Sequence, residues 1–480
     1  MAEHVLALDL GTTGVRALVV GADGAIRARA WRPLTARFPH PGWLEQDPAE
    51  YWRRSNETVR AALDAARLSA RDLAAIGVVT QRATALAWDA DHGVPLGPAI
   101  GWQDQRTEAR VGELVAQGIP VSTMTSATKL AWLLHHEPAL REASRTRRLR
   151  LGTPDVWLTD RLTGGAAFAT DASQASCTGL YDLRSGAWSA PALELFEIEC
   201  AWLPALFATN AVVGETPRAW LGASVPVAAR AGDQQAATFA QGALAPGAAK
   251  LTVGTSAILE LHRGDAPPRA SRGAYPLALW ELEHARRAFC LEGTVVTAGA
   301  AIEWLVDLGL LASAGDLDAV AARAPTPEGV VCVPALQGLG TPYLDGSARA
   351  MLLGLSRGSR VEHVVRAMLE GIAQRCADVC EALAPAPGPL RVDGGLARSE
   401  AFVAALADAL GREVWRAAEI ETTALGAAYL AGLAVGVWRS AEEAVATAAA
   451  PTRIAPRIPD AQRRERRAAW QRAVERAQSG

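Results

Sequence analysis

The sequence is poor in several features that mark special classes of protein. Its six cysteines are spread thinly and form no CxxC pair, so they suggest neither a zinc site nor a disulfide framework. No stretch approaches the ~18 uninterrupted apolar residues of a membrane span. Acidic and basic residues nearly balance, and the formal net charge of −3 excludes a nucleic-acid binder that depends on an overall basic field. We therefore expect neither a nucleic acid nor a membrane as a partner.

Lysine is the scarcest charged residue. Only Lys129 and Lys250 are present beside 46 arginines, a bias that we attribute to genome composition. The N-terminus has neither the basic start nor the long apolar stretch of a secretion signal, so we expect a cytoplasmic protein. A chain of 480 residues with 50% apolar side chains is long enough for two or more domains, at roughly 100–200 residues each.

The beginning of the chain shows alternating apolar residues separated by polar turns. Residues 4–10 and 15–20 are predicted strands around a Gly-Thr-Thr-Gly turn, and residues 25–30 continue an antiparallel meander. Helical spacing follows over 48–68, after which residues 73–80 form a buried strand. Strands and helices keep alternating, which predicts an α/β protein.

The second half repeats the opening pattern. Residues 247–254 and 257–262 are predicted strands, joined by a Gly-Thr-Ser turn. A repeat at half the chain length indicates two similarly folded halves that face a shared cleft. The small residues with a proline at 240–248 suit a boundary, so we predict domains over 1–240 and 241–480.

The two turns are candidate phosphate sites. In residues 9–14, Asp-Leu-Gly-Thr-Thr-Gly, the glycines let the backbone approach a ligand and the threonines add hydroxyl donors. Asp9, at the end of a strand, could hold Mg2+ through water, and Arg16 could bind phosphate. A plain polar turn is the alternative for either segment. The chain has neither GxxxxGK[ST] nor a GxGxxG that opens a helix after the first strand, which excludes the P-loop and Rossmann motifs.

Two further turns follow predicted strands. Residues 393–395, Asp-Gly-Gly, precede a helical stretch over 400–410, and the bare backbone leaves room for a base or ribose. Asp233 follows the strand predicted at 225–231 and begins a helix. It is either a simple N-cap or the base that accepts a hydroxyl proton during phosphoryl transfer.

Together these segments resemble the FGGY family of carbohydrate kinases over nearly the whole chain. Residues 124–133 and 350–370 are similar to the two signatures of that family, although His135 replaces a usual acidic or amide residue. Within the family the chain is most similar to glycerol kinases, through segments 81–82, 102–106, 152–158, 232–237 and 421–432. The resemblance implies an α/β fold of two ribonuclease-H-like domains, of the actin/hexokinase type, that flank an active-site cleft.

The resemblance also implies roles. Residues 1–240 would form the N-terminal FGGY domain, which binds substrate and phosphate, and 241–480 the C-terminal, nucleotide-binding domain. Asp233 would be the general base, and Asp9 (via water) and Asp233 would hold Mg2+. Substrate contacts would come from Arg82, Ala83, Trp102, Met124, Asp233, Gln234 and Ile258. The ATP site would contain Thr12, Thr13, Gly14, Arg16, Thr255, Gly299, Glu303, Gly395 and Ser399.

Two positions depart from the glycerol kinases, which place Glu where this chain has Ala83 and Tyr where it has Met124. Losing a carboxylate and a phenol removes about two hydrogen bonds, worth roughly a factor of 10–1000 in glycerol affinity. We therefore expect an ATP-dependent kinase of a small polyol or sugar other than glycerol. The alternatives are a kinase of a ketopentose such as xylulose or ribulose, and a non-catalytic relative that binds nucleotide or sugar. Relatives are often dimers or tetramers, so a homo-oligomer is expected.

Overall fold

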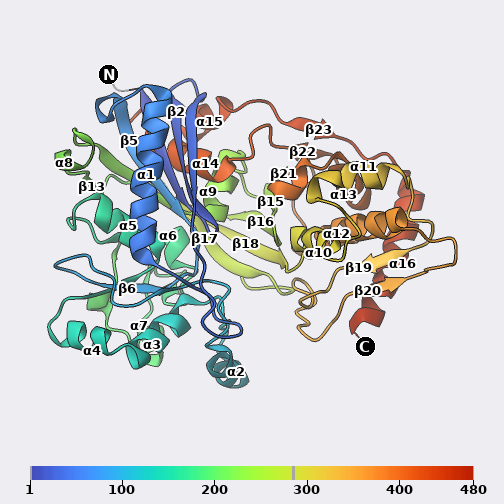
Figure 1. Cartoon of the computed structure of the whole chain (residues 1–480), viewed down its shortest axis with the longest axis horizontal. Helices are drawn as coiled ribbons and strands as arrows, with labels where there is room; N and C mark the ends of the chain where they lie inside the picture. The colour runs from blue at the N-terminus through green and yellow to red at the C-terminus, as the bar shows by residue number, and fades with distance from the viewer. Residues whose placement is uncertain (1–2, 284–286, 479–480) are drawn as a thin grey trace.

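The structure is a computed structural model that describes residues 3–283 and 287–478. It contains two large mixed sheets that lie in separate lobes (Figure 1). The first has the order β13-β14-β5-β1-β2-β3 and the second β17-β18-β16-β15-β21-β22-β23. In chain order the strands of the first sheet are β1 (His4–Leu10), β2 (Gly14–Gly21), β3 (Ile26–Pro33), β5 (Leu73–Thr80), β13 (Gly214–Glu215) and β14 (Pro226–Gly232). Those of the second are β15 (Ala249–Val253), β16 (Ala257–Gly264), β17 (Tyr275–Glu281), β18 (Arg287–Val295), β21 (Leu390–Asp393), β22 (Val414–Arg416) and β23 (Thr452–Ile454).

The two sheets repeat one topology. In the first, β1 pairs antiparallel with β2 and parallel with β5, and β5 continues in parallel to β14. In the second, β15 pairs antiparallel with β16 and parallel with β21, which continues in parallel to β22. The predicted repeat and the two-domain α/β fold are therefore confirmed. The repeat also brings each glycine-rich turn to the same edge of its sheet, where parallel strands end.

The observed bounds of the strands and helices lie close to the predicted ones. The strands predicted at 4–10 and 73–80 and the helix at 400–410 have the expected bounds, while the helix predicted over 48–68 ends two residues early. Arg67 follows that helix with a φ of 56°, and this left-handed conformation ends the helical hydrogen bonding.

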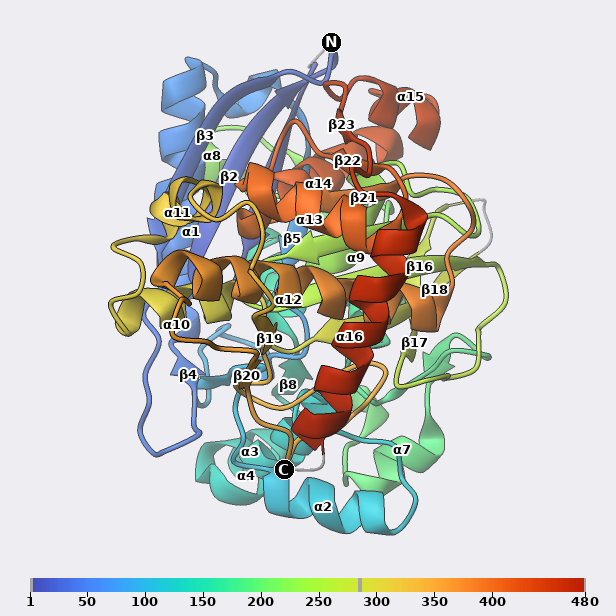
Figure 2. The same ribbon diagram turned by 90° about the vertical axis from the view of Figure 1, so that its right-hand side faces the viewer.

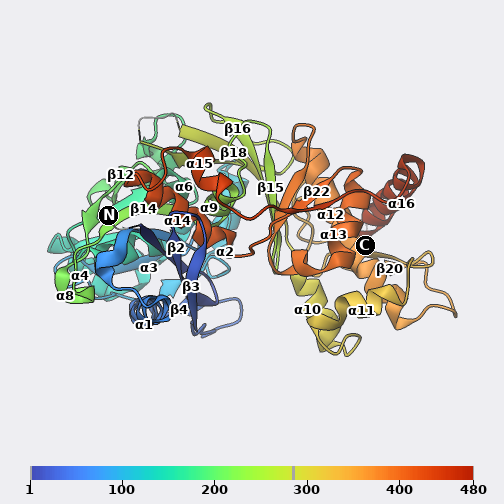
Figure 3. The same cartoon turned by 90° about the horizontal axis from the view of Figure 1, so that it is seen from above.

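Helices cover both faces of each sheet. The first sheet packs against α1 (Pro48–Ala66) and α5 (Pro154–Leu162) on one side and α9 (Asp233–Ala240) and α14 (Thr422–Ala434) on the other. The second packs against α12 (Val361–Leu383) and α13 (Glu400–Leu410). Figure 3 shows the lobes from above, with α14 in the left lobe although it comes late in the chain.

Helix α14 is buried on nearly all sides and joins the halves. It packs against β1, β5 and β14, and a Cβ on Gly426 would lie 2.0 Å from the backbone oxygen of Ala236 in α9. Only glycine allows this approach. Residues of β17 and β18, in the second sheet, complete the same hydrophobic cluster, so the two lobes share apolar packing.

Smaller elements are inserted between the main strands. Residues 85–213 hold a separate hydrophobic cluster around α3 and β6. In the first half these elements are β4 (Glu45–Gln46), η1 (Ala70–Asp72), β6 (Leu86–Asp89), β7 (Ala99–Ile100), α2 (Glu108–Ala116), α3 (Ser126–His136), α4 (Pro138–Arg145), β8 (Leu149–Gly152), β9 (Ala169–Asp171), α6 (Ala172–Ala175), β10 (Tyr181–Asp182), β11 (Ala187–Trp188), α7 (Ala190–Leu195), η2 (Cys200–Trp202), β12 (Ala205–Phe207) and α8 (Arg218–Leu221). In the second half they are α10 (Gly299–Asp307), η3 (Ala314–Asp316), α11 (Leu317–Ala322), β19 (Val331–Val333), β20 (Met351–Leu353), η4 (Gly395–Arg398), α15 (Ala441–Ala446) and α16 (Asp460–Gln478).

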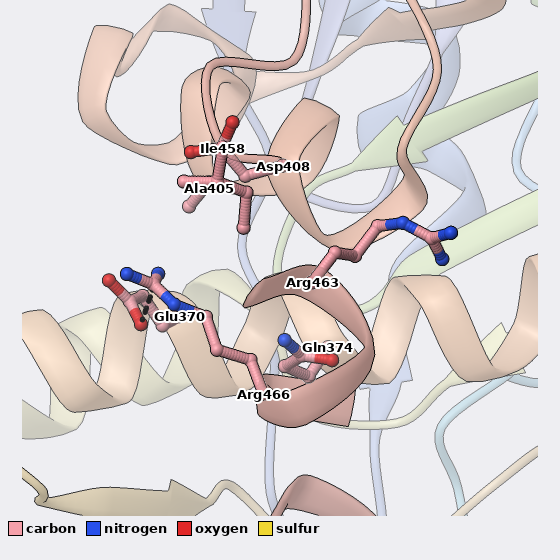
Figure 4. A pocket seen from close by; sticks show the side chains of 7 residues that line it. All are labelled: Glu370, Gln374, Ala405, Asp408, Ile458, Arg463 and Arg466. Carbon is pink, nitrogen blue, oxygen red and sulfur yellow. Dashed lines mark ion pairs between the residues drawn. The ribbon is translucent and has the colours of Figure 1, made fainter. Parts of the chain in front are cut away.

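Helix α16 crosses the outer side of the second lobe (Figure 2). Its mixed charges suggest a solvated helix, but Trp470 is buried and donates a hydrogen bond from its indole nitrogen to Asp378 at 3.1 Å. Figure 4 shows the contact of α16 with α12 and α13, where Arg466 pairs with Glu370 at 3.5 Å. The cavity between them is about 10 Å³, hardly enough for one water, so it is a packing gap.

Within the described residues, no helix is long and apolar enough to cross a membrane.

Candidate active site

The first phosphate turn is closed and connected to the inserted segment. The Gly11 amide donates to the Gly14 carbonyl at 3.0 Å, which tightens the turn between β1 and β2. The Trp102 indole nitrogen donates to the Thr12 hydroxyl at 3.0 Å. Thr13 at the tip is exposed. The structure therefore brings a predicted nucleotide residue, Thr12, against a predicted substrate residue, Trp102.

Asp9 and Arg16 lie opposite each other across β1 and β2, and their side chains pair at 3.1 Å. Burial raises the pKa of Asp9 to about 7, Arg16 opposes this rise, and the nearby carboxylate of Asp233 adds to it. Arg16 also contacts Glu421, before α14, at 2.9 Å. A carboxylate whose pKa is raised by burial and by a second carboxylate lies in an environment that favours a cation.

Arg82 lies between two carboxylates. Its Nε donates to Oδ1 of Asp233 at 3.1 Å, and its Nη1 donates to Glu292 at 2.7 Å. The amide of Gln234 also donates to Oδ1 of Asp233, at 2.8 Å. Within the described residues, Oδ2 of Asp233 has no hydrogen bond, and the side chain is 30% exposed. One oxygen of Asp233 is thus held and the other is free.

Partial burial raises the pKa of Asp233, although Arg82 opposes the rise. Helix α9 begins at Asp233, and its N-cap residue is Gly232, which has no side chain that could cap the helix. The interpretation of Asp233 as a simple N-cap is therefore wrong, because Asp233 is the first helical residue and its carboxylate faces Arg82.

Ala83 has a φ of 62°, in the left-handed region, and is buried. The ammonium group of Lys129, in α3, donates to the Ala83 carbonyl at 3.0 Å. Burial lowers the pKa of Lys129 to about 7, Asp104 opposes this, and Arg106 adds to it. Lys129 thus holds the backbone just after Arg82 in an uncommon conformation.

A row of polar side chains connects Gln234 to the second sheet. The Lys250 ammonium donates to the side-chain oxygen of Gln234 at 2.9 Å and to the Thr252 hydroxyl at 2.8 Å. Thr252 and Thr422 both donate to the carboxylate of Asp393. Because lysine can only donate, Lys250 requires the oxygen of the Gln234 amide to face it and leaves the NH2 group for a ligand.

The nucleotide-side motifs meet beside β15. The Gly299 amide, at the start of α10, donates to the Gly254 carbonyl at 2.8 Å. Gly394 has a φ of 92°, and a Cβ there would lie 2.6 Å from the Val253 carbonyl oxygen. The surroundings of Gly395 are open, and Thr255 and Glu303 are exposed. The loop at 394–395, the turn at 254–256 and the start of α10 therefore form one surface.

Other predicted residues are less directly connected. The Ser399 hydroxyl caps α13 by accepting from the Phe402 amide at 3.0 Å and also bonds to Asp318, so its role is at least partly structural. Ile258 is partly buried on β16, and Met124 is 40% exposed just before α3. Gly14 is required by packing, since a Cβ there would lie 2.4 Å from the Trp31 indole nitrogen.

Sequence reasoning missed four charged residues of this region, namely Glu292, Lys129, Lys250 and Glu421. Both lysines of the chain are fully buried against predicted substrate residues, so attributing their scarcity to genome composition overlooked a signal. Lysine is used at these two buried positions, whereas all the other Lys or Arg positions of the chain hold arginine. Glu292 also had a signal, since it interrupts the apolar strand at 288–295.

The buried Lys129 predicts a pH-dependent stability. The folded chain releases this proton near pH 7, whereas the unfolded chain holds it to about pH 10. Since the unfolded state binds more protons between these values, this group makes the free energy of unfolding rise with pH above 7, by up to ~1.4 kcal/mol per pH unit. In urea unfolding at pH 7.0, 7.8 and 8.5, Lys129→Met should lack this part of the rise. The exposed-site control Arg110→Met should keep it, and equal slopes for wild type and Lys129→Met would contradict the assignment.

Comparison with known proteins agrees with this geometry. The N-terminal domain of the FGGY family of carbohydrate kinases matches residues 4–240, and its C-terminal domain matches residues 249–435. The glycerol kinase of Aromatoleum aromaticum is 43% identical over 99% of both chains. The crystal structure of Plasmodium falciparum glycerol kinase with ADP has a TM-score of 0.91 at 26% identity, covering 99% of this chain and 98% of that one. Xylulose kinase from Rhodospirillum rubrum has a TM-score of 0.84 at 27% identity, covering 98% of this chain and 97% of that one. The chain therefore belongs to the FGGY family of carbohydrate kinases and is an ATP-dependent carbohydrate kinase.

Proposed function

We propose that this kinase transfers the γ-phosphoryl group of ATP to a primary hydroxyl of a small polyol that is longer than glycerol. The observation that supports it is the Arg82–Asp233 pair at 3.1 Å, with a free carboxylate oxygen, beside a position where Ala83 supplies no polar side chain. The pair suits a hydroxyl group as phosphoryl acceptor. Because Ala83 and Met124 supply no polar side chains, glycerol would lack hydrogen bonds there, which disfavours glycerol as the substrate.

Asp233 acts as the general base in this proposal. Arg82 and the Gln234 amide hold Oδ1, so Oδ2 is free to accept the proton of the attacking hydroxyl. Its raised pKa makes the carboxylate a better proton acceptor than an exposed one. Phosphoryl transfer depends mostly on positioning and charge stabilisation, so one oriented base is sufficient.

The nucleotide lies between the two turns in this proposal. The Gly11–Gly14 turn and Arg16 bind the phosphates from the first lobe, and residues 254–256 bind them from the second. The surface around Gly299, Glu303, Gly395 and Ser399 takes the nucleoside. Asp9 (through water) and Asp233 would hold Mg2+, which neutralises charge on the phosphates. The neighbouring carboxylates fit such an ion, since the charge of Asp233 raises the pKa of Asp9.

The acceptor pocket has an apolar wall and few polar groups. Trp102 and Ile258 supply the wall against the substrate carbons, and Met124 adds an exposed apolar side chain. Arg82 and the NH2 group of Gln234 donate to substrate hydroxyls, with Lys250 fixing the Gln234 amide. A four- or five-carbon polyol gains apolar contact in such a pocket, whereas glycerol loses two hydrogen bonds there.

A substrate panel tests the proposal. We expect kcat/KM for erythritol or xylitol to exceed that for glycerol at least tenfold in an assay coupled to ADP release. Xylulose and ribulose distinguish the ketopentose alternative, for which the xylulose kinase likeness is the supporting observation. A clear preference for glycerol would contradict the substrate assignment while leaving the kinase activity intact.

We also place the reaction in the cytoplasm and expect a dimer or tetramer, as the family resemblance suggests. Light scattering of the purified chain would test the assembly, and a monomer at micromolar concentration would contradict it.

A further inference from the structure

A cavity of about 680 Å³ lies between the two lobes, beside α14. Its walls come from both halves of the chain: the turn between β2 and β3, the end of α9, strands β21 and β22, one side of α14, and the loop at 445–451. None of the predicted acceptor or phosphate residues lines it. The volume falls within the range of about 300–1,000 Å³ that small-molecule sites occupy.

One end of the cavity lies away from the phosphate turns. The Gly11–Gly14 turn begins β2, whereas the turn at 23–26 that lines the cavity follows the other end of the same strand. An eight-residue strand spans roughly 25 Å. A ligand at this end of the cavity would therefore not overlap a nucleotide held by the phosphate turns.

Arg391 adds a positive charge to a cavity wall whose other charged residues, Asp23, Arg29 and Glu419, are engaged in ion pairs. In the sheet register Lys250, Arg391, Trp415 and Arg453 occupy adjacent strands on one face. Lys250 is neutralised by Glu260 at 3.7 Å, but among the described residues no carboxylate pairs with Arg391. Its guanidinium carbon lies 5.7 Å from the centroid of the Trp415 ring, which Arg453 also approaches, at 4.9 Å. Burial lowers the pKa of Arg391, as expected for a desolvated cation without a partner.

A second donor in the cavity is also unsatisfied. Gln241, just after α9, lines the cavity, and its side-chain nitrogen is buried with no hydrogen-bond acceptor among the described residues. A buried donor without an acceptor costs about 1–3 kcal/mol, so such groups usually have a partner. The Gln241 nitrogen is itself inaccessible, so the groups that a ligand can reach here are the Arg391 guanidinium and the Trp415 indole ring.

We propose that this cavity is a second ligand site, which binds a small organic anion whose phosphate group is held by Arg391 and whose flat ring packs against Trp415. An arginine fork matches phosphate oxygens, and the indole offers a face to a ring.

Binding there would connect the lobes. Arg29 on β3 pairs with Glu419 after β22 at 3.0 Å, so the cavity wall already contains a contact between the halves. The occupant also touches Thr422, Leu425 and Tyr429 of α14, which packs on the first sheet and whose first residue, Thr422, donates to Asp393. A ligand in this place would contact both lobes and so fix the angle between them.

Calorimetric titration of the whole chain with phenyl phosphate tests the site, with inorganic phosphate as the probe that lacks a ring. Phenyl phosphate should bind at least tenfold more tightly than inorganic phosphate, and Arg391→Gln should weaken it at least tenfold. Trp415→Phe provides a second variant if Arg391→Gln does not fold. Arg416→Gln, on the neighbouring strand β22 and paired with Glu400, is the matched control for Arg391→Gln and should bind as wild type does.

Two results would overturn the proposal. One is binding that Arg16→Gln abolishes and Arg391→Gln leaves unchanged, which would place the probe in the nucleotide site. The other is the absence of saturable binding. Hydrogen exchange gives an independent readout, since phenyl phosphate should protect amides at 22–25 and at 447–450 together. Protection of one wall alone would contradict a ligand that bridges the lobes.

Discussion

Asp233→Asn should lower kcat at least 1,000-fold while changing ADP affinity less than threefold. The carboxylate is replaced by an amide that cannot accept the hydroxyl proton, and general bases contribute about 10²–10⁴ in rate. ADP binding should persist because both phosphate turns and the surface near Gly299 and Gly395 are unaffected. Steady-state kinetics with the best acceptor and calorimetry with ADP measure the two quantities.

The control for this variant is Asp64→Asn, an exposed carboxylate on α1, which should leave both quantities unchanged. Turnover within tenfold of wild type in Asp233→Asn would remove Asp233 from the role of base. A loss of ADP binding would instead show that the carboxylate acts mainly in the nucleotide site.

The fold was predictable because its information is local. Each half begins with two apolar strands around a Gly-Thr turn, and this pattern alone predicted the repeat that the two sheets confirm. Asp393 and Asp233 were found because each follows a strand end. The phosphate turns were found for the same reason, since a turn between alternating segments is visible in any short window.

The missed features depend on long-range packing. Nothing near Ala83 in the sequence indicates its positive φ, because that conformation is fixed by Lys129, 46 residues away. Arg82 and Glu292 are 210 residues apart, and their pairing requires both sheets in place. Helix α14 lies in the C-terminal half of the chain but packs on the first sheet, which no local pattern specifies. In the sequence itself, such long-range contacts are indicated only by a charged residue within an apolar strand, as at Glu292, or by an uncommon lysine, as at Lys129.

The substrate preference should move towards glycerol in the double variant Ala83→Glu with Met124→Tyr. The added carboxylate and phenol supply hydrogen bonds worth about 1.5–3 and 0.5–1.5 kcal/mol. Together they should raise kcat/KM for glycerol roughly 30- to 2,000-fold and lower it for erythritol and xylitol by filling the pocket. Glutamate adds no new backbone strain at position 83, because alanine already has a Cβ at the same φ of 62°.

The single variants separate charge from volume. Ala83→Gln has nearly the size of Ala83→Glu but no negative charge, so it should give a smaller gain for glycerol and the same loss for xylitol. Met124→Tyr alone should give the smaller of the two gains, because its hydroxyl forms a neutral hydrogen bond and Met124 lies at the exposed rim. Equal changes for all acceptors in the double variant would mean that positions 83 and 124 affect the cleft as a whole. The determinants of acceptor size would then lie elsewhere, at Trp102 or Ile258.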